Sequence, residues 1–359
     1  SGETPLQLNW WSAPVKTLDA EVRAQAEERQ LQLTKPPGAL GKLEQLAIDL
    51  ASMQGRERPQ LDSIYISIFA GDHGIAEEGV SAFPQAVTAE MIRNFSNGGA
   101  AICVLAQRCQ ASFEVVNLGT VVELGDMPAV IDARIAPSTA NFSREPAMSE
   151  TQLERAMQAG ADAAERAAES GAQLFVGGEM GIANTTSASA IAAALLQLEA
   201  DFLTGPGTGV DAKGVQHKAE VITAALAFHH CGRQFELRPP LEVLRRLGGF
   251  EIAALAAAYI RCAQLGVTVL VDGFISTVAA LVATTINAET AGWLLYSHGS
   301  AEPGHRRVLA ALGAEPLVNL NMRLGEGSGA ALVVPLLQSA CALHNQMATF
   351  AEAAVSAKQ

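Results

Sequence analysis

The stretch that decides the fold is SIYISIFAGDHG, residues 63–74. Its first eight residues form a short apolar run of the length of a buried strand, and the Gly-Asp-His-Gly that follows is typical of a turn. Comparable apolar runs bounded by Gly, Asp or Asn occur further along the chain, and each predicts another strand. These runs are residues 112–118, 172–176, 267–271 and 294–296.

Helical patterns lie between the predicted strands. They cover residues 85–95, 99–110, 149–169, 184–196, 214–229, 250–264, 273–286 and 303–312. Strands that alternate with helices favour a parallel sheet with helices on both faces, so we expect an α/β fold. The longest irregular stretch, residues 120–147, predicts a loop that crosses the surface or reaches a partner subunit.

The two ends of the chain differ in pattern from its middle. Residues 17–33 and 41–53 carry helical patterns that precede the first predicted strand, and residues 328–354 read as helix again. No low-complexity linker separates these ends from the rest of the chain. We expect the C-terminal helix to pack on the N-terminal pair.

Composition limits the classes of function. Of the 359 residues, 49% are hydrophobic and 17% are charged, which supports a large core and argues against long disorder. A formal net charge of −13 repels nucleic acid and anionic membranes. The five cysteines include no C-x-x-C pair, so we expect reduced thiols rather than disulfides or a zinc site. Without a membrane-spanning apolar run or a signal peptide at its start, the sequence predicts a cytoplasmic protein.

Polar residues follow directly on the predicted strands. In an open parallel sheet the ligand lies beyond the carboxyl ends of the strands, so these residues are candidates for a site. Glycine after a strand is also common in plain turns, and Asp72 or Asp272 suits a helix N-cap. The concentration of such residues nevertheless favours one shared ligand site. The segments concerned are residues 71–74, 177–186, 272–274, 297–300 and 323–329.

Glu179 and Glu326 are the strongest candidates for functional residues, because both stand among glycines on loops that enter predicted helices. The structural alternative is a carboxylate that complements the positive end of a helix dipole. Flanking glycines let a ligand approach the backbone closely, and they leave the carboxylate uncovered. The glycines therefore favour a functional role for both glutamates.

A glycine-rich loop, GPGTG at residues 205–209, precedes the helix predicted at 214–229. Such a loop presents backbone N–H groups to an anion at a helix start. It is neither a Walker A loop nor a dinucleotide fingerprint. Lys218 and the nearer Lys213 are alternative partners for a phosphate, and a solvated surface suits both lysines as well.

The histidines do not predict a metal site. His217, His229 and His230 lack an acidic third ligand at a suitable spacing, and the sequence has no H-E-x-x-H motif. His73 and His298 follow predicted strands, where we expect them to orient loops through hydrogen bonds.

Motifs spread along the chain together resemble the nicotinate-nucleotide–dimethylbenzimidazole phosphoribosyltransferase family. They are KPPGALGKLE (35–44), AGDHGIAEEGVSAFPQAVT (70–88), GGEMGIANTT (177–186), VDGFISTVAAL (271–281), SHGSAE (297–302) and RLGEGSGAAL (323–332). The resemblance implies a Rossmann-like parallel sheet flanked by helices at residues 61–327. It also implies a small helical domain formed by residues 1–60 and 328–359, a homodimer, small-molecule substrates and no cofactor.

The resemblance also implies roles for individual residues. Glu326, in RLGEGSG, matches the general base of the family. For Phe83 and Met91, which fall where the family lines its base pocket, the alternative is an ordinary place in the core. The family varies at these two positions, so the apolar pair leaves the exact base open. The predicted substrate-binding residues are Glu179, Gly181, Gly207, Lys218, Asp272, Ser300, Phe83 and Met91.

The implied chemistry asks for one base. Nicotinate leaves the donor with a neutral ring nitrogen, so no general acid is needed. The attacking benzimidazole still bears an N–H proton, and one carboxylate beside it suffices to remove that proton. We expect Glu326 to be ionised at neutral pH because it stands near a helix start. A single displacement inverts the anomeric carbon from β to α without a covalent enzyme intermediate.

Other functions fit part of this pattern. The same transfer to a different base needs only a different base pocket. A protein that binds a nicotinate nucleotide without turnover needs the phosphate loop but not Glu326. An unrelated Rossmann-type oxidoreductase is disfavoured, because no G-x-G-x-x-G follows the first predicted strand.

Overall fold

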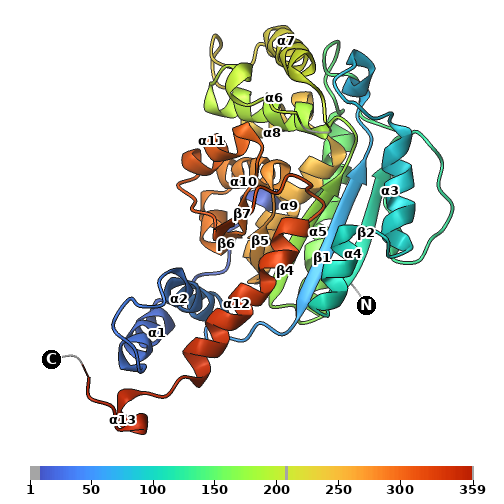
Figure 1. Cartoon of the computed structure of the whole chain (residues 1–359). Coiled ribbons are helices and arrows are strands. Elements are labelled where there is room, and N and C mark those ends of the chain that lie inside the picture. The colour runs from blue at the N-terminus through green and yellow to red at the C-terminus, as the bar shows by residue number, and fades with distance from the viewer. Residues whose placement is uncertain (1–8, 207–208, 358–359) are drawn as a thin grey trace.

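The computed structural model describes residues 9–206 and 209–357. Its central element is a six-stranded sheet in the order β3-β2-β1-β4-β5-β6, and every pair of neighbours is parallel (Figure 1). This is the strand order of a doubly wound dinucleotide-binding sheet, which confirms the predicted Rossmann-like α/β fold. The strands are β1 (Ile64–Gly71), β2 (Ser112–Gly119), β3 (Val130–Asp132), β4 (Leu174–Met180), β5 (Thr268–Val271) and β6 (Leu294–Tyr296).

Strand β1 shows why a continuous apolar run becomes the centre of the sheet. All of its residues except Tyr65 are buried, because both faces of the sheet are covered. Ile66 and Ile68 point into one hydrophobic core, and Phe69 points into the core on the opposite face. A strand buried on both sides has no polar face, so its sequence shows no hydrophobic–polar alternation.

Helices form the two covering layers. The first core is shared by α5 (Glu150–Glu169), α6 (Asn184–Leu196), α7 (Ala212–Phe228), α8 (Pro240–Leu247), α9 (Phe250–Leu265), α10 (Phe274–Ile286) and α11 (Pro303–Ala311). The second core is shared by α2 (Lys42–Gln54), α3 (Ala86–Ser96), α4 (Ala101–Arg108) and α12 (Ser328–Gln346). Within the described residues, no helix is both long enough and apolar enough to cross a membrane.

The predicted packing of the chain ends is confirmed. Helices α1 (Ala20–Gln32) and α2 lie beside the far end of α12 (Figure 1). The Arg29 guanidinium Nε donates to the His344 carbonyl at 2.7 Å, and Leu33 forms a bridge with Thr349. Ala330 and Val334, at the start of α12, belong to the core against the sheet. One long helix therefore connects the sheet to the terminal helices.

Each predicted helix and strand is present, with ends that differ by a few residues. The helix predicted to residue 354 stops at Gln346, and a short α13 (Phe350–Ala353) follows it. The sequence analysis did not predict β3, α8 or the two-stranded sheet of β7 (His298–Gly299) and β8 (Val318–Asn319).

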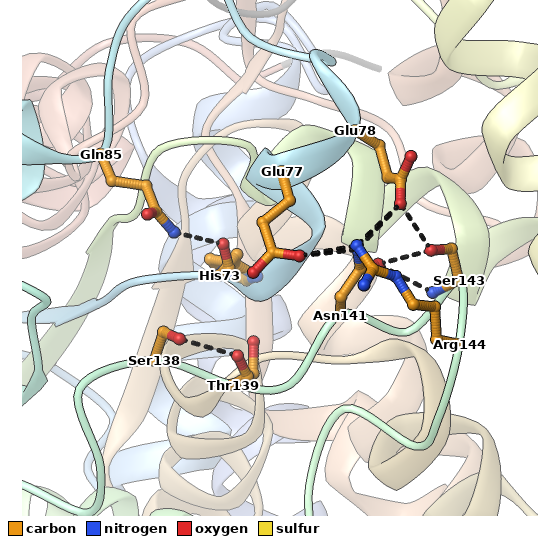
Figure 2. A network of polar contacts seen from close by, with 9 residues as sticks. All are labelled: His73, Glu77, Glu78, Gln85, Ser138, Thr139, Asn141, Ser143 and Arg144. Atoms are coloured by element: carbon orange, nitrogen blue, oxygen red, sulfur yellow. Dashed lines mark hydrogen bonds and ion pairs between the residues drawn. The ribbon is translucent and has the colours of Figure 1, made fainter.

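Segment 120–147 crosses the surface beside the strand ends, as predicted, but its residues 130–132 form the edge strand β3. Figure 2 shows part of it facing the 3-10 turn η2 (Gly74–Glu78) that follows β1. The Asn141 amide donates to Glu78 Oε1 at 2.9 Å, and Arg144 forms an ion pair of 2.9 Å with Glu77. These contacts hold the turn after β1 against segment 120–147.

Candidate active site

A cavity of roughly 570 Å³ opens at the carboxyl ends of β4 and β5. It lies where ligands bind in this fold, and its size is that of a small-molecule site. The loop before α12 and the N-terminal part of α3 close its sides. The predicted site residues that line it are Phe83, Met91, Glu179, Gly181, Asp272, Ser300 and Glu326. Of the other two, Gly207 lies outside the described residues, and Lys218 lies behind the cavity wall.

Glu326 occupies an unusual turn. Gly325, Glu326 and Gly327 have φ values of 78°, 61° and 77°, so three successive residues are left-handed. A non-glycine residue in that region costs about 1–3 kcal/mol and persists where the surroundings fix it. The turn packs on Gly178 of β4 so tightly that a Cβ there would lie 2.7 Å from the Glu326 carbonyl carbon. Glycine at 178 lets the loop carrying Glu326 rest directly on the sheet.

Asp272 fixes this turn from the end of β5. Its carboxylate accepts hydrogen bonds from the backbone N–H of Gly327 at 2.9 Å and of Ala330 at 3.0 Å. Asp272 thus caps α12, which is remote in sequence, rather than α10, which follows it directly. Asp272 is therefore a helix cap, as the alternative interpretation of the sequence held. The helix that it caps is α12, which follows Glu326.

The same carboxylate changes the acidity of Glu326. Burial first, and the negative charge of Asp272 second, raise the pKa of Glu326 to about 7. With a pKa of about 7, Glu326 is partly ionised at neutral pH, so the expectation of an ionised carboxylate holds only in part. The positive end of the helix does not keep the pKa of Glu326 low, because Glu326 is only 7% exposed and lies near the carboxylate of Asp272.

Glu179 stands at the end of β4 and is also buried. Its Oε1 accepts a hydrogen bond of 3.5 Å from the Asn184 amide, and its Oε2 has no partner among the described residues. Burial, followed by the charges of Asp272 and Glu326, raises the pKa of Glu179 well above its ordinary value. A raised pKa favours the protonated form of this carboxyl group, which can donate a hydrogen bond into the cavity.

Lys218, not Lys213, is the buried lysine of α7. Only 1% of Lys218 is exposed, whereas Lys213 is on the surface. The Lys218 ammonium donates to the Thr185 hydroxyl at 2.5 Å and to the Gly205 carbonyl at 3.2 Å. Burial lowers the pKa of Lys218 to about 8, although Glu302 opposes the shift. Since Thr185 lines the cavity, a positive charge stands directly behind this wall.

A buried ion pair supports the floor of the site. His73 Nε2 lies 2.6 Å from Glu251 Oε2, and both side chains are almost fully enclosed. Although burial disfavours the charged imidazole, Glu251 holds the pKa of His73 above its ordinary value. The His73 carbonyl accepts a 2.7 Å hydrogen bond from the Gln85 amide, which is drawn in Figure 2. The imidazole is held by Glu251 of α9, which sequence reasoning missed, so loop orientation by the His73 side chain stays a prediction.

The far side of the cavity is apolar. Phe83 is 51% exposed and Met91 is partly buried, and both line the cavity. The alternative that Phe83 is an ordinary core residue is therefore wrong. Met180 and Phe274 line the cavity too and were not singled out, although each stands inside a quoted motif. Among the described residues, no group of three His, Cys, Asp or Glu side chains is arranged to hold a metal ion.

Fold and cavity together define an α/β enzyme that acts on small molecules. A family model described as "Phosphoribosyltransferase" matches residues 15–355. The chain belongs to this phosphoribosyltransferase family.

Its relatives share one name. It is 62% identical to the nicotinate-nucleotide–dimethylbenzimidazole phosphoribosyltransferase of Pseudomonas putida, over 97% of this chain and 98% of that protein. It is 58% identical to the protein of the same name from Pseudomonas aeruginosa, over 98% and 99% of the two chains. A crystal structure of CobT from Thermus thermophilus is similar with a TM-score of 0.89 and 44% identity, over 94% of this chain and 100% of that one.

Proposed function

We propose that this chain transfers the phosphoribosyl group of nicotinate mononucleotide to 5,6-dimethylbenzimidazole. The products are nicotinate and α-ribazole 5′-phosphate, which supplies the lower-ligand nucleotide of cobalamin. The shared name of the relatives supports this donor and acceptor. The observation that carries the proposal is the carboxyl group of Glu326, which the turn before α12 places at the cavity and whose pKa is raised to about 7.

Glu326 acts as the general base. The free nitrogen of the acceptor attacks the anomeric carbon, and the electrons of the breaking bond return to the pyridinium nitrogen of nicotinate. Nicotinate therefore leaves without needing a proton. The N–H proton on the other acceptor nitrogen passes to Glu326, whose pKa of about 7 suits a base at physiological pH. Because attack and departure occur on opposite faces, the β-nucleotide gives an α-product.

The phosphate of the nucleotide binds at the cavity wall that Thr185 lines, in front of Lys218. Lys218 and Ser300 hold the phosphate, together with Gly207, which belongs to the glycine-rich loop. The Lys218 ammonium donates a hydrogen bond to the hydroxyl of Thr185 in this wall. Glu179, whose raised pKa favours the protonated form, donates a hydrogen bond to a ribose oxygen.

The acceptor ring lies between Phe83 and Met91. An aromatic face stacks on a planar base, and methionine adapts to the ring edge. The cavity wall there is apolar, which supports a methylated bicyclic ring rather than a polar purine. Transfer to another base is the nearest alternative, and a binding protein without turnover is the second.

One assay separates these functions. Protein is mixed with nicotinate mononucleotide and dimethylbenzimidazole, and the products are separated by chromatography. Transfer releases nicotinate and α-ribazole 5′-phosphate in equal amounts. A binding protein releases neither, and an enzyme for another base releases nicotinate only when that base replaces dimethylbenzimidazole.

The proposal extends to the oligomeric state of the protein and to its cellular compartment. We expect a cytoplasmic homodimer in which residues 1–60 and 328–359 form a small helical domain. Two-fold dimers are the commonest soluble oligomers. The described ends of the chain do pack together, which supports such a domain. Light scattering that finds an active monomer at working concentration would contradict the dimer.

A further inference from the structure

Arg323 is the only arginine or lysine among the described residues that line the cavity. Its side chain is exposed, and within the described chain its guanidinium takes part in no ion pair or hydrogen bond. The same cavity is lined by four carboxyl groups, those of Glu179, Asp272, Glu302 and Glu326. An unpaired cation therefore lines a cavity that is rich in carboxyl groups.

The proposed donor carries two anionic groups, a phosphate and the carboxylate of its pyridine ring. Lys218 serves the wall formed by Thr185 and Gly205, where we place the phosphate. Arg323 stands in the separate loop before α12, three residues before Glu326. The ring carboxylate still needs a partner, because an unpaired charge in an acidic cavity is strongly disfavoured.

We propose that Arg323 binds the ring carboxylate of the donor and thereby makes the site select nicotinate over nicotinamide nucleotides. This inference rests on the proposed function. A guanidinium matches a carboxylate with two parallel hydrogen bonds, which an uncharged carboxamide does not reproduce. The positive ring nitrogen offsets the carboxylate in the donor, and this charge disappears as the bond breaks. The attraction to Arg323 therefore strengthens toward the transition state, so it raises kcat/KM.

The test compares two donors, nicotinate mononucleotide and nicotinamide mononucleotide, with dimethylbenzimidazole held constant. We expect the native protein to favour the nicotinate donor by roughly 10- to 150-fold in kcat/KM. Arg323→Ala should lose about that factor for the nicotinate donor and change less than about threefold for the nicotinamide donor. Arg323→Lys keeps the charge but not the paired geometry, so it should retain part of the preference. Arg306→Ala, an exposed arginine of α11 outside the cavity, is the matched control.

The ratio of the two donors is measured within one preparation, so partial loss of folding cancels. An equal loss for both donors would place Arg323 at the phosphate or in the scaffold, and unchanged kcat/KM values for both donors would remove it from the site. Either result overturns the inference. If the native protein releases no nicotinate at all, the proposed function itself fails. Calorimetric binding of the two nucleotides to native protein and Arg323→Ala, without acceptor, then still decides whether Arg323 distinguishes them.

Discussion

Replacing Glu326 by glutamine should stabilise the folded protein, and more so as the pH rises. Glutamine has the size of a protonated glutamate and keeps the backbone turn, but it cannot become charged. The native carboxyl group has a pKa of about 7 in the folded chain, against an ordinary value of 4.5. A group whose pKa is raised by folding destabilises the fold wherever it is ionised.

The magnitude follows from these two values. A tenfold change in proton affinity corresponds to about 1.4 kcal/mol, so ionising Glu326 costs the folded chain roughly 3 kcal/mol more than the unfolded chain. Below pH 4.5 the group is protonated in both states, and it contributes no penalty. The penalty grows as the pH rises from 4.5 to 7 and is complete above 7. Between pH 5.5 and 8 it should increase by about 2 kcal/mol.

The assay is urea unfolding of the native protein and of Glu326→Gln at several pH values, at one protein concentration. The free-energy difference between the two proteins should increase by about 2 kcal/mol from pH 5.5 to pH 8. Glu289→Gln, an exposed residue far from the cavity lining, gives the background. A difference that stays constant within about 0.5 kcal/mol over this range would refute the buried, charge-repelled state of Glu326.

Three further predictions concern the neighbours of Glu326 and the two ends of the cavity. Asp272→Asn removes a negative charge and so lowers the pKa of Glu326, which moves the acid limb of the kcat/KM profile to lower pH; an unmoved limb would limit Asp272 to a structural role. Lys218→Ala should weaken donor binding by about 1.5–3 kcal/mol, seen as a higher KM, and an unchanged KM would place the phosphate elsewhere. Dimethylbenzimidazole should be preferred over adenine by roughly 5- to 150-fold, because the slot beside Phe83 and Met91 leaves purine polar groups unpaired; equal use in competition kinetics would contradict this.

The sheet was predictable where the strands are buried on both faces. β1, β4 and β5 read as continuous apolar runs ending in glycine or aspartate, and these runs mark their position within a few residues. β3 has only three residues, and each of them pairs with β2 at the edge of the sheet. β3 forms because the edge of β2 offers hydrogen-bond partners, so its own three residues give no recognisable strand pattern. Helix α8 was missed although Pro240 stands at its first position, where proline is favoured.

The residues of the cavity were predictable as strand-end motifs, but their electrostatic states were not. The pKa of Glu326 depends on its burial and on Asp272, which another strand brings beside it. His73 is paired with Glu251, a residue 178 positions away that belongs to no motif of the sequence. Likewise, the sequence left Lys218 and the nearer Lys213 as alternatives, and only the packing of α7 shows which lysine is buried. Charge states follow from three-dimensional neighbours that a linear pattern does not contain.

The most direct test of the central claim is single-turnover transfer by the native protein and by Glu326→Gln. Enzyme in excess is mixed with nicotinate mononucleotide and dimethylbenzimidazole, and both products are followed by chromatography from pH 5.5 to 8.5. The account predicts that native transfer rises with pH and levels off above about 7, and that Glu326→Gln is slower by about 10²–10⁴ at the plateau. A folded Glu326→Gln protein with near-native rates, or a native rate that falls as the pH rises through 7, would contradict it.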